Sequence, residues 1–449
     1  MTPRGPGRLG RRTPLILPAL LLVLLVQIAS ATWLVPSFLS PNPSTLIAQN
    51  LVETGRYQGG SWSLLIGDAE PPSERPRMYQ LPGEALYLAL WFRYLPPGLH
   101  RYAHVPVTTA MIGAVSLVAF CVGGPRAAAA AAIIATVQPF TILHGPVWDD
   151  TFLGAALVWT IIAILTSVMA HPPPLGLGPW ALMTLGALAA MAAVTRTLES
   201  GILLAIGVGL LLPISISPKR LRPHGLAVLV GLLMGLSAWG FRNYRTVGEF
   251  SVSSSHDGLT LYQSIGPMAR SGIKGGQVER FMTSENMGPH WQRTADMTEP
   301  DVNRYFRGEA VRYAVEHPMS VGTTALLKIG ISLAGIRPEL PIRSFRNVVA
   351  LTSNFLLLSL TVLWLVMLWR GTMSIDRIVG FYLSVVATAV LVLLALGPIG
   401  WRYRIALDGV LWIGSANVLT TWLSGFPLFG GRGREGRAVN GPPEGSVTL

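Results

Sequence analysis

Charged residues make up only 12% of this 449-residue chain, and cysteine occurs once, at Cys121. A soluble domain usually carries about 25% charged residues, so this composition excludes a soluble enzyme and a disordered chain. One cysteine can form neither an internal disulfide nor a cysteine-built metal site, which excludes a disulfide-stabilised secreted domain. The chain has instead 51% hydrophobic residues and a mean hydropathy of +0.48, which together with its long apolar runs predict a polytopic membrane protein.

Apolar runs long enough for transmembrane helices recur along the chain. The first follows Arg4, Arg8, Arg11 and Arg12, and basic residues in this position keep a segment in the cytosol. Cleavage of a signal peptide at Ala29-Ser30-Ala31 is the alternative for this first run. Ten spans are predicted: Pro14–Val35, Val105–Val122, Ala127–Leu143, Thr151–Met169, Pro179–Val194, Gly201–Ile216, Gly225–Gly240, Val348–Trp369, Ile378–Leu396 and Ile405–Leu423.

The distribution of basic residues supports this count. Ten spans place both chain ends in the cytosol, where lysine and arginine are expected to concentrate. Two further apolar pieces, Leu81–Leu95 and Thr323–Gly335, are short for a span and are predicted to be interfacial or re-entrant helices. The short segments on the cytosolic side then hold Arg126, Lys219, Arg220, Arg222, Arg370, Arg377, Arg432, Arg434 and Arg437.

The expected fold is an all-α polytopic membrane protein with about ten transmembrane helices and two long extracytosolic loops. Within the second loop, apolar residues recur at helical spacing over Asp301–Glu316, which predicts an amphipathic helix. The predicted segments are a basic cytosolic N-terminus (1–12), the first transmembrane helix (13–35), a first extracytosolic loop with a juxtamembrane helix (36–104), transmembrane helices two to seven (105–241), a large extracytosolic loop (242–347), transmembrane helices eight to ten (348–424) and a disordered cytosolic tail (425–449).

Ionisable residues at the ends of the predicted spans form a candidate functional site, because such residues are costly near a membrane and tend to face a cavity or a partner. A guanidinium group matches phosphate oxygens bidentately, and a nearby carboxylate can accept a proton from an attacking hydroxyl. Four separate connections bring such groups to the extracytosolic face: Asp149 and Asp150, Arg196 and Glu199, Arg242 and Arg245, and Arg402 and Arg404.

Three of these four pairs also have a purely structural interpretation. Asp149 or Asp150 can cap the helix that follows. Arg196 and Glu199 are three residues apart and can pair with one another, while the late arginines can anchor at the membrane interface. The coincidence of all four pairs on one face favours a functional site.

Several short motifs follow one another along the chain: Ala48-Gln49-Asn50-Leu51 with Gly55-Arg56-Tyr57, Leu81-Pro82-Gly83 with Leu86-Tyr87-Leu88-Ala89, Phe241-Arg242-Asn243-Tyr244 with Gly248-Glu249-Phe250, Ala310 to His317-Pro318, and Arg402-Tyr403-Arg404. Their order resembles that of the GT-C membrane glycosyltransferases, in the branch of the dolichyl-phosphate-mannose protein mannosyltransferases and the lipid A aminoarabinose transferase. None of the motifs is specific by itself, and their order over nearly the whole chain carries the resemblance.

The resemblance implies a sugar donor carried on a polyprenyl phosphate and used at the extracytosolic face. An unidentified acceptor would attack the anomeric carbon, with inversion. Membrane lipids are the other expected partners, and nucleic acid is not expected as one. No cofactor is predicted with certainty; a divalent metal stays open, although no residues indicate it. The implied catalytic carboxylates are Asp149 and Asp150, and the implied donor-binding or lipid-phosphate-binding residues are Arg196, Glu199, Arg242, Tyr244, Arg402, Tyr403 and Arg404.

One position departs from the family pattern. Relatives carry an acidic residue shortly after the first span, where this chain has Ser40-Pro41-Asn42-Pro43-Ser44. The main catalytic carboxylate of the family therefore does not carry over to this chain. Besides Asp149 and Asp150, the further candidates for the base lie in the first loop: Asp68, Glu70, Glu74 and Glu84.

Two other classes of function stay open. A catalytically silent relative acting as an assembly partner is compatible with the missing acid. A lipid or sugar transporter or flippase would favour broken helices and internal symmetry near the middle of the membrane, whereas the charges here gather at one face. The Ala-, Gly-, Arg- and Pro-rich composition predicts a bacterial inner membrane, with the site facing the periplasm or the exterior.

Overall fold

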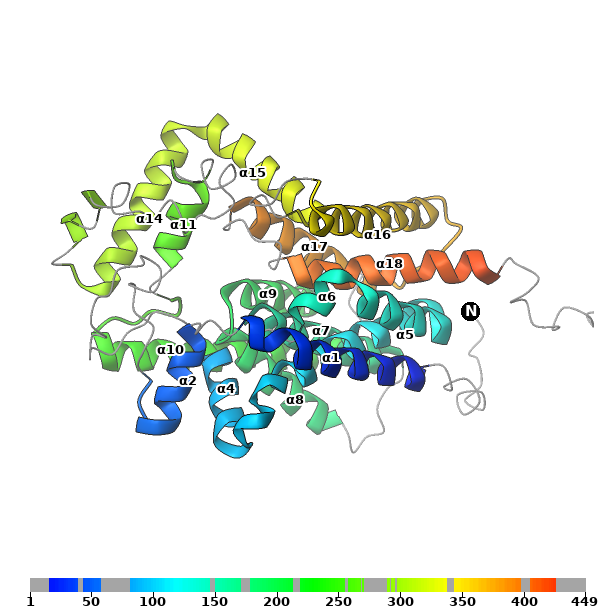
Figure 1. Ribbon diagram of the computed structural model, residues 1–449, viewed down its shortest axis with the longest axis horizontal. Coiled ribbons are helices and arrows are strands. Elements are labelled where there is room, and N and C mark those ends of the chain that lie inside the picture. The colour runs from blue at the N-terminus through cyan, green and yellow to red at the C-terminus, as the bar shows by residue number, and fades with distance from the viewer. Residues whose placement is uncertain are drawn as a thin grey trace, which may run out of the picture.

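The computed structural model describes residues 16–38, 43–57, 81–145, 150–170, 178–212, 219–254, 257–267, 269, 289–290, 292–294, 297–336, 343–396 and 404–424. Every regular element within these ranges is a helix. Most of the longer helices run along the long axis of the molecule, and a group of shorter ones gathers at one end (Figure 1). The all-α architecture predicted from the sequence is confirmed.

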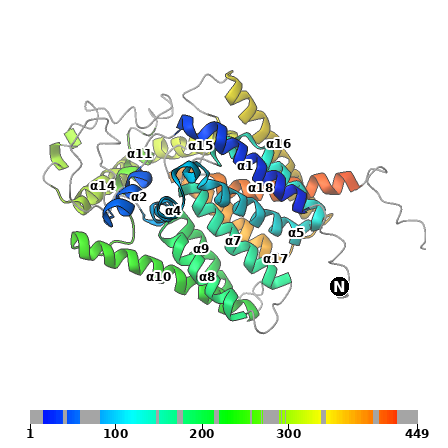
Figure 2. The same cartoon turned by 60° about the horizontal axis from the view of Figure 1, so that its bottom comes forward.

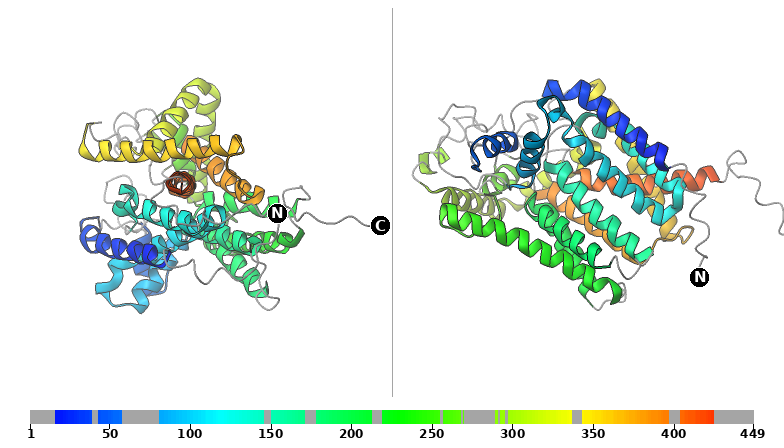
Figure 3. Two further views of the ribbon diagram at one scale, coloured as in Figure 1. Left: turned by 90° about the vertical axis from the view of Figure 1, so that its right-hand side faces the viewer. Right: turned by 90° about the horizontal axis from the view of Figure 1, so that it is seen from below.

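The described part of each of the ten ranges that were predicted to be spans is helical (Figure 3). Among the described residues, six helical stretches are both long and apolar enough to cross a membrane, while α8 and α9 are apolar but have only 16 and 15 residues. The bundle consists of α1 (Ile16–Phe38), α5 (His104–Val137), α6 (Pro139–His144), α7 (Asp150–Ala170), α8 (Gly178–Ala193), α9 (Thr197–Leu211), α10 (Arg222–Val247), α16 (Phe345–Trp369), α17 (Arg377–Leu396) and α18 (Ile405–Ser424).

Helix α5 is two helices joined at a sharp reversal. Gly124 has φ 80° and ψ −169°, a conformation that glycine adopts without a Cβ penalty, and Pro125 then starts the next helix. The Thr108 hydroxyl donates to the carbonyl oxygen of Gly145 over 2.6 Å. A straight helix of 34 residues would be about 50 Å long, so these two groups can meet only if the chain turns back. The sequence prediction of two separate helices here is confirmed.

The centre of the bundle is formed by α7 and α18, which are buried along most of their length. The Trp159 indole of α7 donates to the carbonyl oxygen of Ala406 on α18 over 3.1 Å. Gly409 allows this approach, because a Cβ there would overlap the Trp159 ring. By contrast, α1 and α16 carry exposed apolar side chains such as Leu17 and Phe355, as expected for helices that face lipid.

The helices from both long loops lie at the same end of the bundle (Figures 1 and 2). The predicted helices at Leu81–Leu95 and Asp301–Glu316 are confirmed as α4 and α14, and the apolar piece Thr323–Gly335 is the later part of the longer helix α15. The elements at this end are α2 (Pro43–Thr54), α4 (Gly83–Tyr94), the 3-10 helix η2 (Pro97–Tyr102), α11 (Asp257–Ile265), α14 (Glu299–Glu316) and α15 (Pro318–Ala334).

The large loop has a small core of its own between α11 and α14. Tyr262 packs against Phe306, with ring centroids 5.5 Å apart. His290 lies between two tyrosine hydroxyls, with Nε2 3.0 Å from Tyr262 and Nδ1 2.8 Å from Tyr305. This core gives α14 a fixed position beside α15, which follows it directly in the chain.

Candidate functional site

The first turn of α7 meets the connection between α8 and α9. Arg196 Nε lies 3.8 Å from an Asp150 carboxylate oxygen and 4.0 Å from a Glu199 carboxylate oxygen. The Glu199 side chain is 1% exposed, Arg196 12% and Asp150 28%, so Asp150 is the most open member. Two predicted carboxylates and one predicted arginine are therefore brought together, and we call them the Asp150 cluster.

Glycine at position 154 makes room for this arrangement. Gly154 follows Asp150 by four residues and therefore lies on the same face of α7. A Cβ there would lie 2.6 Å from Glu199 Oε1 and 2.7 Å from its Cδ. The glycine thus allows the Glu199 carboxylate to lie against the α7 backbone.

The first-loop helix α4 is docked beside the Asp150 cluster. The amide of Gly83 donates to the carbonyl oxygen of Val194 over 2.7 Å, and a Cβ on Gly83 would overlap Thr195. The next residue, Glu84, is buried, with Oε1 3.7 Å from Nε2 of the buried His104. Helix α4 thus brings one first-loop carboxylate close to the connection that carries Arg196.

Arg242, at the end of α10, is held by two aromatic rings. Its guanidinium carbon lies 5.0 Å from the ring centroid of Tyr57 and 4.9 Å from that of Trp239. It also donates to the Asn243 side chain over 3.0 Å and to the Tyr57 carbonyl oxygen over 3.5 Å. Tyr244 is two residues further on and is exposed, so it points to another face of the helix.

Tyr57 links Arg242 to the first loop. Burial raises the pKa of its hydroxyl above the ordinary value, the Arg242 charge opposes this shift, and the Glu84 charge adds to it. Both charges therefore act at the Tyr57 hydroxyl. The only sequence signal for Tyr57 was its place in the Gly55-Arg56-Tyr57 motif.

Arg404 lies in a different environment. It is 1% exposed and 2.9 Å from the Asp408 carboxylate, one turn later on α18. Its guanidinium also donates to the carbonyl oxygens of Ser332 (3.1 Å) and Leu333 (2.6 Å), at the C-terminus of α15, and to the Asn354 side chain on α16. Arg404 thus caps the C-terminus of α15, where a positive charge interacts favourably with the helix dipole.

The network around Arg404 extends to α6. The Trp412 indole donates to Oε1 of the Gln138 side chain over 2.8 Å, and Nε2 of the same side chain donates to Asn354 Oδ1 over 3.4 Å. The candidate site residues predicted from the sequence did not include Gln138, Asn354 or Asp408. Their signal was a polar residue within or next to an apolar run, and such residues in membrane proteins usually face the interior of the bundle.

Apart from Tyr244, the described residues that were predicted for the site lie in three places: the Asp150 cluster, the Arg242 stack and the Arg404 network. The remaining predicted residues Asp149, Arg402 and Tyr403 lie outside the described residues, as do Asp68, Glu70 and Glu74. Within the described part of the chain, no group of three or more His, Cys, Asp or Glu side chains is arranged to hold a metal ion.

No protein-family model and no curated protein matches the chain. Solved structures are similar to it. The apo oligosaccharyltransferase of Archaeoglobus fulgidus superposes with a TM-score of 0.51 at 12% identity, over 92% of this chain and 51% of that one. The same enzyme with zinc and sulfate gives 0.49 at 12% identity, over 91% and 49%. ArnT from Cupriavidus metallidurans, bound to undecaprenyl phosphate, gives 0.42 at 13% identity, over 92% and 79%.

The superposition on the apo oligosaccharyltransferase is the one that supports a shared fold, and the chain spans about half the length of that enzyme. Together with the apolar helices, it confirms the architecture expected from the motifs at Tyr57, Gly83 and Arg242. The chain is an integral membrane protein with the GT-C fold.

Proposed function

We propose that this chain is a membrane glycosyltransferase that moves a sugar from a polyprenyl-phosphate donor to an acceptor hydroxyl, with inversion, at the extracytosolic face of a bacterial inner membrane. The meeting of Asp150, Arg196 and Glu199 beside the docked first-loop helix carries this proposal. A partly open carboxylate beside a guanidinium group provides a base and an anion-binding group at one place.

In the proposed reaction the acceptor oxygen forms a bond to the anomeric carbon while the bond from that carbon to the phosphate oxygen breaks. The hydroxyl proton passes to the Asp150 carboxylate, and the phosphate leaves on its lipid with an added negative charge. Fixed cations stabilise such a developing charge strongly where water is excluded. Arg196 and Arg242 are the described cations suited to this task, because both lie near the first-loop helices.

Asp150 is a better candidate for the base than Glu84. The Asp150 carboxylate is 28% exposed, so a hydroxyl can approach it. Glu84 is only 2% exposed and lies beside the buried His104. A substrate would have to open the packing of α4 to reach Glu84, whereas Asp150 is accessible in the present arrangement.

Arg404 is assigned a supporting role. Its guanidinium already contacts the Asp408 carboxylate and the end of α15. A phosphate there would have to replace charge-assisted hydrogen bonds that hold three helices together. We therefore assign phosphate binding to Arg196 and Arg242.

The experiment is a sugar-transfer assay in proteoliposomes with polyprenyl-phosphate sugars of several kinds. Asp150→Asn removes the proposed base with almost no change in volume, and a loss of 10² to 10⁴ in rate is expected. Asp376→Asn is the matched control, since Asp376 also stands at a helix start, where its side chain accepts from the Ile378 amide. Full activity of Asp150→Asn would overturn the assignment and favour a different base. No transfer by the wild type with any of the donors would favour a silent assembly partner.

A further inference from the structure

Helices α8 and α10 lie side by side (Figure 2). A Cβ on Gly231 of α10 would overlap the carbonyl oxygen of Gly186 on α8, and a Cβ on Gly235 would overlap that of Ala190. A step of four residues along α10 thus matches a step of four along α8, so the two helices are parallel. Helix α8 begins eight residues before Gly186 and α10 nine residues before Gly231. The two N-termini therefore lie at the same level.

Arg220 shows at which end of the bundle these N-termini lie. It belongs to the 3-10 helix η3 (Lys219–Leu221), and its guanidinium donates to the carbonyl oxygen of Met169 over 2.7 Å. Met169 is in the last turn of α7, whereas Asp150 is the first residue of this helix. The two residues are about 30 Å apart along the helix axis, which is the thickness of the hydrocarbon core of a bilayer. The starts of α8 and α10 therefore lie at the membrane face opposite the Asp150 cluster.

The start of α10 is strongly basic. Lys219 and Arg220 are exposed, and Arg222 is partly buried, with an Nε that makes no hydrogen bond in the described part of the chain. None of these three side chains forms an ion pair with a described carboxylate. Leu221, the residue at the N-cap, provides no side-chain hydrogen bond to the first turn of α10. Free amide groups at a helix start add to the positive potential of the basic side chains.

His224 is a buried polar side chain at the same place. It is 9% exposed, and the Arg220 backbone lies beside its ring, but neither ring nitrogen reaches a hydrogen-bond partner in the described part of the chain. His224 precedes Gly231 by seven residues, so it lies on the face of α10 that packs against α8. Helical side chains lean toward the N-terminus of their helix, which directs this ring to the two helix starts. Buried polar groups are nearly always hydrogen-bonded, so the ring indicates a ligand from outside the chain.

The surface next to these helix starts is apolar. Both helices expose large side chains along their length, at 47% to 66%: Trp180 and Met183 of α8, and Leu226, Val230 and Leu233 of α10. Trp180 lies in the first turn of α8, and tryptophan is typical of the level of the lipid headgroups. A ligand with an anionic head and apolar chains therefore matches both parts of this surface.

We propose that the starts of α8 and α10 bind the phosphate of an anionic phospholipid, in the leaflet opposite the Asp150 cluster. Arg222, His224 and the free amide groups of the first turns donate hydrogen bonds to the phosphate oxygens, and Lys219 and Arg220 add positive charge. Basic pockets between transmembrane helices bind anionic headgroups in this way. The acyl chains lie on the exposed apolar side chains of α8 and α10. This site is independent of the proposed sugar transfer, which takes place at the other face.

The experiment titrates the purified full chain with lipids in native mass spectrometry. Phosphatidylglycerol and phosphatidylcholine with the same acyl chains are the probes, because only the first carries a net negative charge, and glycerol phosphate is the soluble competitor. Arg222→Gln removes one cation, and His224→Phe removes the ring nitrogens but keeps an aromatic ring. Arg370→Gln is the matched control, since Arg370 is an exposed arginine at the end of α16, a helix that packs mainly against α18.

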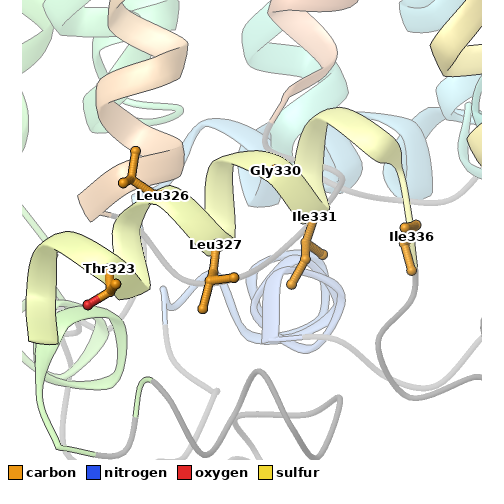
Figure 4. Close-up of a pocket in the computed structure, with 6 residues that line it drawn as sticks. All are labelled: Thr323, Leu326, Leu327, Gly330, Ile331 and Ile336. Carbon is orange, nitrogen blue, oxygen red and sulfur yellow. The ribbon is translucent and has the colours of Figure 1, made fainter.

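A second control tests lipid that merely covers an apolar surface. The exposed face of α15 is such a surface: Leu327, Ile331 and Ile336 point to the same side (Figure 4), and none of the residues that line this face is charged. Gly330 lies in its middle, where a Cβ would meet no described atom within 4 Å. Gly330→Trp changes the shape of this face and should leave the preference for phosphatidylglycerol unchanged.

The wild type should bind phosphatidylglycerol about tenfold more tightly than phosphatidylcholine. Arg222→Gln and His224→Phe should each weaken phosphatidylglycerol binding about fivefold and leave phosphatidylcholine binding unchanged, while Arg370→Gln should match the wild type. Equal binding of the two lipids by the wild type overturns the site whatever the variants do, and so does equal phosphatidylglycerol binding by Arg222→Gln and Arg370→Gln. Displacement of the lipid by an equal concentration of glycerol phosphate identifies a free phosphate as the ligand and overturns the lipid assignment.

Discussion

The packing of Gly154 against Glu199 gives a quantitative test of the Asp150 cluster. In Gly154→Ala the new Cβ would lie 2.6 Å from Glu199 Oε1, which is closer than real Cβ contacts allow. Helix propensity alone favours alanine by about 0.5–1 kcal/mol. Overpacking of a close contact costs about 1–3 kcal/mol. The net change is thus between about zero and about 2.5 kcal/mol of destabilisation.

Gly201→Ala is the matched control for this calculation. Gly201 also lies in a helix, α9, and among the described residues a Cβ there would meet no atom within 4 Å. Gly201→Ala should therefore be stabilised by the greater helix propensity of alanine, without any steric overlap. The difference between the two variants therefore isolates the overlap, which we expect at about 1–3 kcal/mol in the free energy of unfolding.

The assays are thermal unfolding in detergent and sugar transfer in proteoliposomes. Gly154→Ala should unfold at a lower temperature than Gly201→Ala and should lose activity, because the Glu199 carboxylate has to leave its place beside Arg196. Gly201→Ala should retain wild-type transfer. The reasoning is refuted if the two alanine variants are equally stable and equally active.

Three further outcomes are expected. Arg404→Ala should destabilise the chain by about 3–5 kcal/mol, because it leaves the fully buried Asp408 without its cation. In thermal unfolding, the double variant Arg404→Met, Asp408→Leu should recover much of that loss. An Arg404→Ala variant as stable as the wild type would contradict this reasoning. Burial lowers the pKa of His290 below its ordinary value of 6.5. At acidic pH the unfolded chain therefore binds more protons at this side chain than the folded chain does. The stability of the large loop should be complete above about pH 6.5 and fall as the pH drops below it. Limited proteolysis at pH 7.5 and 5.5 measures this, and His290→Gln should show less pH dependence. Arg242→Lys keeps the charge but loses the stacking on Tyr57 and Trp239; we expect weaker donor binding at unchanged thermal stability, and unchanged binding would exclude Arg242 from the site.

Much of the fold could be predicted from the sequence, because apolar length and basic residues at span ends are local signals. The break at Gly124-Pro125 is one example, since both residues have strong backbone preferences. Helix α18 shows the limit of such signals. It contains the polar residues Asp408 and Asn417 and is buried along most of its length. Its place in the bundle therefore depends on contacts with the neighbouring helices and not on an apolar sequence alone.

The candidate site could be predicted only in part. Arg196 and Glu199 are three residues apart, so their meeting is a local event that the sequence shows directly. The docking of Gly83 on Val194 and Thr195 depends on residues more than a hundred positions apart. No periodicity encodes that contact, and the same is true of the hydrogen bonds from Arg404 to the end of α15.

The sequence places Arg196, Arg242 and Arg404 at one face, but their surroundings give them different tasks. Arg404 is fully enclosed and contacts Asp408 and the carbonyl oxygens at the end of α15. A ligand at Arg404 would have to break these contacts. Arg242 is only partly buried and lies between two flat rings, which orient its guanidinium without neutralising it. Arg196 lies beside two carboxylates, which would offset its charge until a phosphate approaches. An enclosed arginine that is hydrogen-bonded to helix ends stabilises the bundle, whereas a partly open arginine can turn toward a phosphate. The chemistry should therefore depend on Arg196 and Arg242.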